Sequence, residues 1–111
     1  MLTIQGLVDY GANVEEGLRR CLNNEDFYIR LVGIAADDAG FDKLADQVRS
    51  GSLSEAFDTA HALKGVLGNL FLTPIYEPVS EITELLRAKT EMDYSALIDK
   101  ILAERDRLKA I

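Results

Sequence analysis

Apolar residues recur at intervals of three or four along the whole of this 111-residue chain. That interval places apolar side chains on one face of an α-helix. No segment shows the alternation of apolar and polar residues that marks a half-buried strand, and no Asn-Gly or Asp-Gly pair marks a hairpin turn. The pattern therefore predicts an all-α protein.

Six helices can be assigned from these apolar stripes. They are expected over about residues 13–22, 24–35, 41–48, 53–72, 73–89 and 93–108. The second and third are separated only by a break around Gly40. Because the connections are short, neighbouring helices should run antiparallel. We expect the last four to form an up-down four-helix bundle, with short N-terminal helices packed against it, in one domain over residues 1–111.

Residues with known helix-terminal preferences support these boundaries. Asn13 with Glu16, and Ser52 with Glu55, have the three-residue spacing of a capping box. Gly51 suits the position that follows a helix C-terminus, where the backbone often turns left-handed. Two helix starts and one helix end are therefore predicted from single residues.

The fifth predicted helix carries both prolines of the chain. Thr73 can act as its N-cap, with Pro74 in the first turn, where the missing N–H is not needed. Pro78 lies deeper and removes a backbone donor, so it is expected to shift the helix start or bend the helix. Asp93 can cap the last helix.

Charge and composition argue against several functions. The formal net charge of −7 opposes binding to nucleic acid. No stretch approaches the roughly 20 apolar residues of a membrane helix. The single Cys21 cannot form an internal disulfide, and no secretory signal precedes it, which favours the cytoplasm. One cysteine and one histidine without further ligands argue against a zinc site. Met1 suits a free-standing protein, which we expect to be a monomer.

His61 is the only histidine, and helical geometry places it away from the core. At about 100° per residue, the apolar residues of its helix fall on the opposite side: Ala56, Leu63, Leu67 and Leu70. The histidine shares its side with Ser54, Phe57, Asp58, Lys64, Gly65, Gly68 and Leu72. We therefore expect an exposed imidazole, which could act as a nucleophile when its nitrogen is unprotonated.

The neighbours of His61 fit a reactive histidine better than an inert one. Gly65 and Gly68 each cost a helix about 1 kcal/mol relative to alanine. They could allow close helix packing, but their position beside His61 favours access for another protein. Lys64 is one turn from His61. It is either an ordinary solvated lysine or a cation that stabilises a phosphoryl group on the imidazole.

The motif around this histidine resembles the signature of histidine-containing phosphotransfer (HPt) domains. The matching residues are Ala60-His61-Ala62-Leu63-Lys64-Gly65, followed by Gly68-Asn69-Leu70. The resemblance extends over nearly the whole chain, from Asn23-Asn24-Glu25-Asp26-Phe27-Tyr28 to the last helix. It implies a helical bundle with an exposed histidine midway along one helix, and transient docking of receiver domains.

The resemblance also implies a role for each matching residue. His61 would carry the phosphoryl group, Lys64 would contact it, and Gly65 would give the partner access. Gly68 matches a position that is usually small. Phe57 and Asp58 share the histidine side and are candidates for the docking surface.

The function implied by the resemblance is that of a phosphocarrier in a two-component phosphorelay. The chain would accept a phosphoryl group from a hybrid sensor histidine kinase or a receiver-domain phosphoaspartate, and pass it to a response-regulator receiver domain. It has no glycine-rich phosphate loop, kinase signature or carboxylate cluster for magnesium. We therefore expect no intrinsic cofactor and no autonomous enzyme activity, with magnesium supplied by the partner receiver domain.

Phe71 departs from the family pattern, because a glycine is common at that position. Its place at the edge of the core stripe suggests a ring packed against a neighbouring helix. Two alternative functions stay open. The chain could be an HPt-like module that binds receiver or kinase domains without phosphate exchange, or a generic helical adaptor in which the motif is a coincidence.

Overall fold

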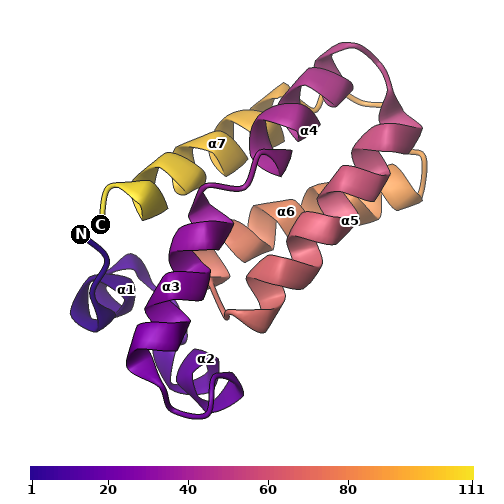
Figure 1. The fold of residues 1–111 in the computed structure, drawn as a ribbon. Helices are drawn as coiled ribbons and strands as arrows, with labels where there is room; N and C mark the ends of the chain where they lie inside the picture. Colours follow the sequence, from indigo (N-terminus) through magenta and orange to yellow (C-terminus); the bar gives the residue numbers. More distant parts are fainter.

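The computed structural model describes all residues 1–111 as helices and short connections, with no strand. Figure 1 shows the order of the helices. They are α1 (Ile4–Tyr10), α2 (Val14–Arg20), α3 (Glu25–Ala36), α4 (Gly40–Arg49), α5 (Leu53–Asn69), α6 (Thr73–Arg87) and α7 (Ser95–Lys109). The all-α prediction is confirmed, and no helix is long and apolar enough to cross a membrane.

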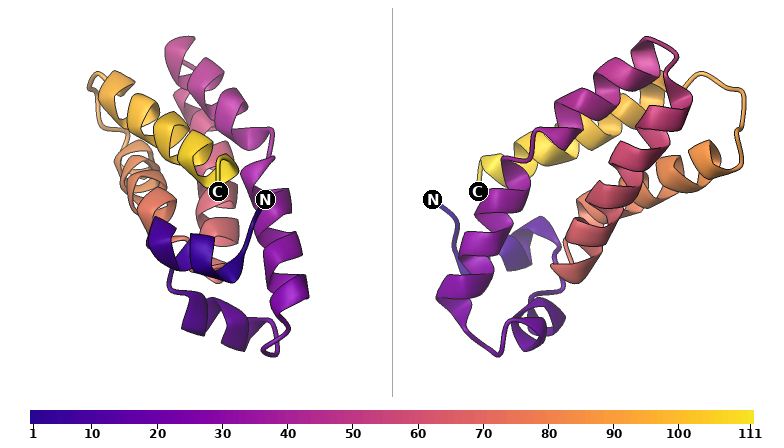
Figure 2. Two further views of the ribbon diagram at one scale, coloured as in Figure 1. Left: turned by 90° about the vertical axis from the view of Figure 1, so that its left-hand side faces the viewer. Right: turned by 45° about the vertical axis from the view of Figure 1, so that its right-hand side comes forward.

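Helices α4 to α7 form an antiparallel up-down bundle. Each packs against the next, and α4 also packs against α7, which closes the four-helix arrangement. Figures 1 and 2 show α1, α2 and α3 gathered at one end of this bundle. The two chain ends lie together there, and the Met1 ammonium donates to the Ile111 carbonyl over 2.9 Å. The predicted bundle with additional N-terminal helices is therefore confirmed.

The core consists of the apolar stripes that the helical spacing indicated. On α5, the buried side chains include Ala56, Leu63 and Leu67, and Leu70 is buried just after the helix. Each fully buried leucine contributes about 1.5–3 kcal/mol relative to an exposed one. This burial fixes the rotation of α5 about its axis and so determines which residues of that helix face outward.

Several predicted helix ends are present. The Asn13 side chain accepts a hydrogen bond from the Glu16 N–H at 3.3 Å, and the Asn24 side chain accepts one from the Phe27 N–H at 3.0 Å. Gly51 follows α4 with a φ of +79°, which a residue with a side chain rarely adopts. These contacts satisfy backbone groups that helix ends leave unpaired.

One predicted capping hydrogen bond is absent, and one predicted N-cap is off by one residue. Ser52 is the N-cap residue of α5, as predicted, but its side chain makes no capping hydrogen bond; its hydroxyl shares a 3.2 Å hydrogen bond with that of Ser50 instead. Thr73 is the first helical residue of α6 rather than its N-cap, which is Leu72. At Ser52, the hydroxyl of Ser50 takes the place of the helix backbone as the hydrogen-bond partner. A local side-chain partner of this kind is not visible in the capping-box pattern.

Pro78 lies within α6, and Asp93 lies just before α7. Helix α6 continues through Pro78, whose ring is buried, so this proline does not set the start of the helix. Packing of the ring offsets part of the cost of the missing N–H. Asp93 accepts a hydrogen bond from the Ser95 N–H at 2.9 Å, but the N-cap residue of α7 is Tyr94, so the predicted cap lies one residue before the observed one.

Helix α1 was not predicted by the apolar pattern. Its start is capped by the Thr3 hydroxyl, which accepts a hydrogen bond from the Gly6 N–H at 2.9 Å. Its end is followed by Gly11, with a φ of +108°. A helix of seven residues is too short for a clear periodic stripe, so the threonine and glycine were the only available signals.

The end of α5 is a left-handed turn centred on Phe71. The Phe71 N–H donates to the Gly68 carbonyl and the Leu72 N–H donates to the Leu67 carbonyl, both over 3.2 Å. This is the Schellman arrangement, in which the residue at the turn has a positive φ. Phe71 has a φ of 56°, which explains why glycine would be favoured there.

This turn also corrects the sequence analysis at Leu72. A helix continuing to residue 72 would place Leu72 on the histidine side, but α5 ends at Asn69. The turn reverses the chain, and Leu72 is fully buried. The helical wheel therefore holds for α5 only as far as the helix extends.

Candidate functional site

His61 lies midway along α5 with its side chain exposed. Its imidazole stacks on the Phe57 ring, one turn earlier, with ring centroids 5.6 Å apart and an interplanar angle of 17°. Phe57 is half-buried and packs against the core. The imidazole thus rests against a fixed aromatic ring, and the predicted exposure of His61 is confirmed.

Lys64 is one turn after His61 and pairs with a residue of the next helix. Its Nζ lies 2.9 Å from Oε1 of Glu84 on α6. The other carboxylate oxygen, Oε2, lies 3.0 Å from Nε of Arg87. A single carboxylate therefore bridges two cations, with one oxygen on each.

Arg87 connects this ion pair to the aromatic stack. Its guanidinium carbon lies 4.9 Å from the centroid of the Phe57 ring, within the range of a cation–π contact. The ring that supports His61 is therefore contacted from α6 as well. His61, Phe57, Arg87, Glu84 and Lys64 form one continuous cluster across α5 and α6.

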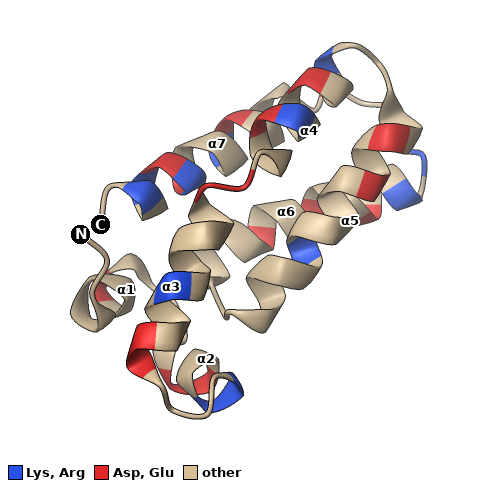
Figure 3. Ribbon diagram, in the orientation of Figure 1, with Lys and Arg blue, Asp and Glu red and all other residues tan.

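The charges in this cluster affect Glu84 most clearly. Hydrogen bonds from Lys64 and Arg87 hold the pKa of the Glu84 carboxyl below its ordinary value, because both donors favour the ionised form. Elsewhere the charges are dispersed, as Figure 3 shows by acidic and basic segments spread over the helices. The cluster is thus a local arrangement on a generally acidic protein.

The two glycines near His61 have different surroundings. A Cβ atom at Gly65 would have no other atom within 4 Å beyond its own helix, whereas one at Gly68 would lie 3.0 Å from Cε1 of Tyr76. Gly65 therefore leaves open space beside the imidazole. At Gly68 the alternative of close helix packing applies, because the ring of Tyr76 from α6 lies against the backbone there.

A shallow depression joins several of the residues that the sequence singled out. It is lined by His61, Lys64, Gly65, Gly68, Asn69 and Tyr76. A second depression beside it shares Gly68 and Tyr76 and extends to Phe71. Phe57 and exposed Asp58 lie on the N-terminal side of His61 on the same helix. The surface around the histidine is open enough for another protein to approach.

Phe71 is half-buried at the edge of this surface and is not part of the core. Its ring centroid lies 5.6 Å from the guanidinium carbon of Arg20, the last residue of α2. The ring therefore contacts a side chain of a neighbouring helix, as expected.

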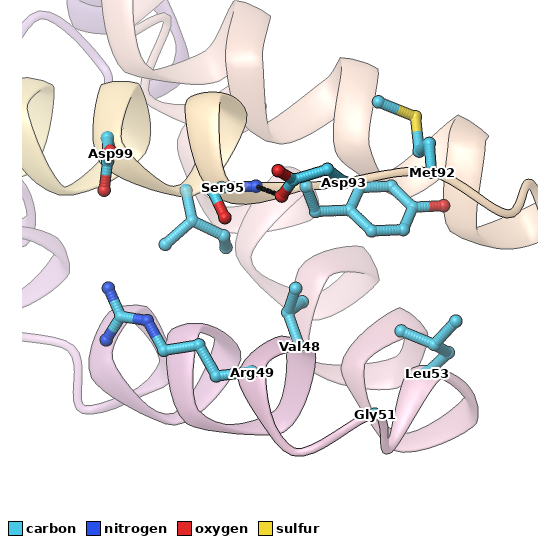
Figure 4. Close-up of a pocket in the computed structure, with 10 residues that line it drawn as sticks. Val48, Arg49, Gly51, Leu53, Met92, Asp93, Ser95 and Asp99 are labelled. Carbon is cyan, nitrogen blue, oxygen red and sulfur yellow. Dashed lines mark hydrogen bonds between the residues drawn. The ribbon is translucent and has the colours of Figure 1, made fainter.

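The largest cavity lies elsewhere, where the connection before α5 meets the start of α7. Figure 4 shows its lining, with Asp93 hydrogen bonded to the backbone of Ser95. The lining includes Arg49 and Asp99 but neither His61 nor Lys64. The Asp93 carboxylate already accepts a hydrogen bond from the Ser95 N–H, and no histidine or cysteine lines this cavity.

Other possible reactive sites are few. Cys21 is a free thiol but is buried, so it is not accessible to a protein partner. No group of three or more His, Cys, Asp or Glu side chains is arranged to hold a metal ion. Of the single histidine and the single cysteine of the chain, only His61 is therefore exposed.

Sequence reasoning missed the contribution of α6 to the site. Glu84, Arg87 and Tyr76 all come from this helix, and each contacts a residue of α5. In the sequence, Glu84 and Arg87 have only the spacing of an ordinary surface ion pair. Their relation to Lys64 and Phe57 depends on how the two helices pack, which the stripes do not specify.

A comparison with protein-family models supports the resemblance. The model described as "Hpt domain" matches residues 35–111, which include the whole of the four-helix bundle and the cluster around His61. Residues 1–34 lie outside the match, so the resemblance covers less of the chain than the sequence analysis suggested. Comparisons with curated proteins and with solved structures gave no match.

Proposed function

The chain belongs to the Hpt domain family, and we propose that it carries phosphoryl groups on His61 in a two-component phosphorelay. Membership of the family implies histidine phosphotransfer in signalling. The observation that supports His61 as the acceptor is its exposure midway along α5, between a supporting aromatic ring and a lysine. It is the only histidine of the chain.

The transfer step needs only a small contribution from this chain. The lone pair of an unprotonated imidazole nitrogen attacks phosphorus of a receiver-domain phosphoaspartate. A nitrogen–phosphorus bond forms as the phosphorus–oxygen bond breaks, and that electron pair returns to the aspartate carboxylate. Transfer to a second receiver domain is the same exchange in reverse. Catalysis then consists of positioning and charge stabilisation.

Lys64 is proposed to stabilise the charge of the transferred phosphoryl group. It is adjacent to His61 on the helix surface and lines the same depression, so its ammonium can reach a group attached to the imidazole. Hydrogen bonds from an ammonium to phosphoryl oxygens are among the stronger ones in proteins. Phe57 would hold the imidazole in place from the other side.

The partner is proposed to be a receiver domain, or the receiver part of a hybrid kinase, which docks on the surface around His61. Gly65 leaves room for its approach, and Phe57 and Asp58 would border the contact. We expect the receiver domain to bring its own magnesium ion and phosphorylated aspartate. This chain would then be a phosphate carrier rather than an enzyme.

The proposal is tested by incubating the protein with a small phosphodonor, phosphoramidate, and separately with purified phosphorylated receiver domains. Phosphohistidine on this chain, with loss of label from a receiver domain, is the expected result. Binding of a receiver domain without any phosphate exchange would instead identify a non-catalytic interaction module. Neither binding nor exchange with a broad set of receiver domains would refute the proposal.

A further inference from the structure

Glu84 of α6 binds Lys64 in an ion pair that the lysine can leave for another acceptor. Its Oε1 accepts from the Lys64 Nζ at 2.9 Å, while its Oε2 accepts from Arg87 Nε at 3.0 Å. About half of the Glu84 side chain is exposed, against about a quarter for Lys64. The lysine is therefore drawn toward α6 by a carboxylate that water also reaches.

Phosphorylation of His61 would give Lys64 a second anionic acceptor. His61 and Lys64 line one depression, so phosphoryl oxygens on the imidazole would be anionic acceptors close to the ammonium that Glu84 binds. An ammonium has three donors on a flexible stem, so it can turn from one acceptor to the other without a change in the helices. The two acceptors therefore compete.

We propose that Glu84 is a positioning residue that competes with the phosphoryl group on His61 for the Lys64 ammonium, and thereby sets the lifetime of the phosphohistidine. This inference rests on the proposed function of His61. In the unphosphorylated chain, Glu84 holds the Lys64 ammonium toward α6. After phosphorylation, Lys64 moves to the phosphoryl oxygens, and Glu84 limits how fully it does so.

Arg87 makes this exchange possible without leaving Glu84 unpaired. It binds the oxygen that Lys64 does not use, and its guanidinium is also placed over the Phe57 ring. When Lys64 leaves, the Glu84 carboxylate keeps one cationic partner and its position on α6. The carboxylate thus remains available to take Lys64 back after the phosphoryl group has been passed on.

The test compares phosphohistidine lifetime in the wild type and in Glu84→Gln, after phosphorylation with phosphoramidate. Glutamine keeps the shape of the side chain but removes the charge that holds Lys64. The lifetime should increase by about two- to fivefold, the factor that corresponds to an exposed ion pair. An unchanged or shortened lifetime would overturn the proposal.

A matched control separates this effect from general charge. Glu81→Gln removes the same charge from the same helix, one turn earlier, and Glu81 is exposed and forms no ion pair. The phosphohistidine lifetime of Glu81→Gln should equal that of the wild type. In a Lys64→Ala background, Glu84→Gln should no longer lengthen the lifetime. A lengthening that persists there, or that Glu81→Gln reproduces, would contradict competition for Lys64.

NMR of the Lys64 ammonium provides a readout that a merely structural role would not change. Its signal should shift when the wild type is phosphorylated, and should also shift without phosphorylation when Glu84→Gln removes its carboxylate partner. A Lys64 signal that is insensitive to phosphorylation would refute the exchange. Failure of the wild type to become phosphorylated at all would refute the proposed function and this inference together, whereas normal phosphorylation with equal lifetimes would refute only the inference.

Discussion

The Tyr28 hydroxyl of α3 donates a 2.8 Å hydrogen bond to the carbonyl oxygen of Leu70, at the end of the helix that carries His61. Tyr28 is fully buried, and α2 packs directly over its ring: a Cβ at Gly17 would lie 2.5 Å from it. The N–H of Asn13 also donates to the Phe71 carbonyl over 2.9 Å. The N-terminal helices thus stabilise the end of α5, although Asn13 and Tyr28 lie outside the family match.

The first prediction concerns this hydrogen bond. Tyr28→Phe should lower the free energy of unfolding by about 1–3 kcal/mol, because a buried carbonyl loses a partner. Urea unfolding followed by circular dichroism measures the change. Tyr76→Phe is a suitable control, since the Tyr76 hydroxyl makes no hydrogen bond within the chain. Equal stability of the two variants would contradict a structural role for the Tyr28 hydroxyl.

The second prediction is the pH dependence of stability at alkaline pH. Burial raises the pKa of Tyr28 from 10.0 to about 12, so the folded chain keeps this proton where the unfolded chain has lost it. The stabilisation from this group is complete below pH 10.0 and is lost progressively as pH rises toward about 12. The unfolding midpoint should therefore fall as the pH is raised from below 10.0 toward about 12.

Tyr28→Phe should reduce that alkaline loss without abolishing it. Burial also raises the pKa of Tyr10 and Tyr94, so these two tyrosines contribute in the same direction. An alkaline loss of the same size in Tyr28→Phe and in the wild type would show that Tyr28 titrates normally.

The third prediction addresses Phe71. A side chain at a left-handed position costs roughly 1–2 kcal/mol that glycine does not incur. Phe71→Gly and Phe71→Ala both lose the ring and its contact with Arg20, but only glycine relieves the backbone. Phe71→Gly should therefore be more stable than Phe71→Ala by about 1 kcal/mol. Equal or reversed stability in urea unfolding would mean that the turn is not left-handed in solution.

The fourth prediction tests access at Gly65. Replacing this glycine with glutamine should keep the protein at least as stable as the wild type, because glycine is unfavourable inside a helix by about 1 kcal/mol and the space beside it is open. Transfer from a phosphorylated receiver domain should be slow, while the reaction with phosphoramidate should be much less affected. Equal slowing with both donors would indicate that Gly65 acts on His61 itself.

Gly68→Gln is the contrasting variant for that experiment. Its side chain would press on the Tyr76 ring, so it should destabilise the protein where Gly65→Gln does not. A stable Gly68→Gln would show that Tyr76 moves aside easily, and the contact would then not explain the glycine.

The sequence predicted the helices with long apolar stripes and the outward direction of His61. Both follow from helical periodicity, because the buried face of a helix determines which residues lie on its exposed face. The same reasoning failed at Leu72, where a left-handed turn ends the periodicity, and at Ser52, where a nearby hydroxyl replaces the backbone as partner. These failures arise where a single local contact decides the geometry.

The contribution of α6 to the site could not be predicted from the sequence. Lys64 and Glu84 are separated by 20 residues, and each has an ordinary place on the exposed part of its helix. Their pairing depends on the rotation and offset of two packed helices, which side-chain packing determines. The two roles considered for Lys64 were a solvated lysine and a phosphoryl contact. Neither included the carboxylate of Glu84, which binds the lysine.

The central claim is that His61 is the phosphoryl acceptor, and mapping the phosphate tests it most directly. The wild type and His61→Gln are incubated with phosphoramidate and with a phosphorylated receiver domain. The samples are then kept at alkaline pH, and mass spectrometry identifies the modified residue. We predict phosphate on His61 in the wild type, none in His61→Gln, and nearly equal thermal stability of the two proteins, because the side chain is exposed. Phosphate on another residue, or undiminished labelling of His61→Gln, would contradict the account.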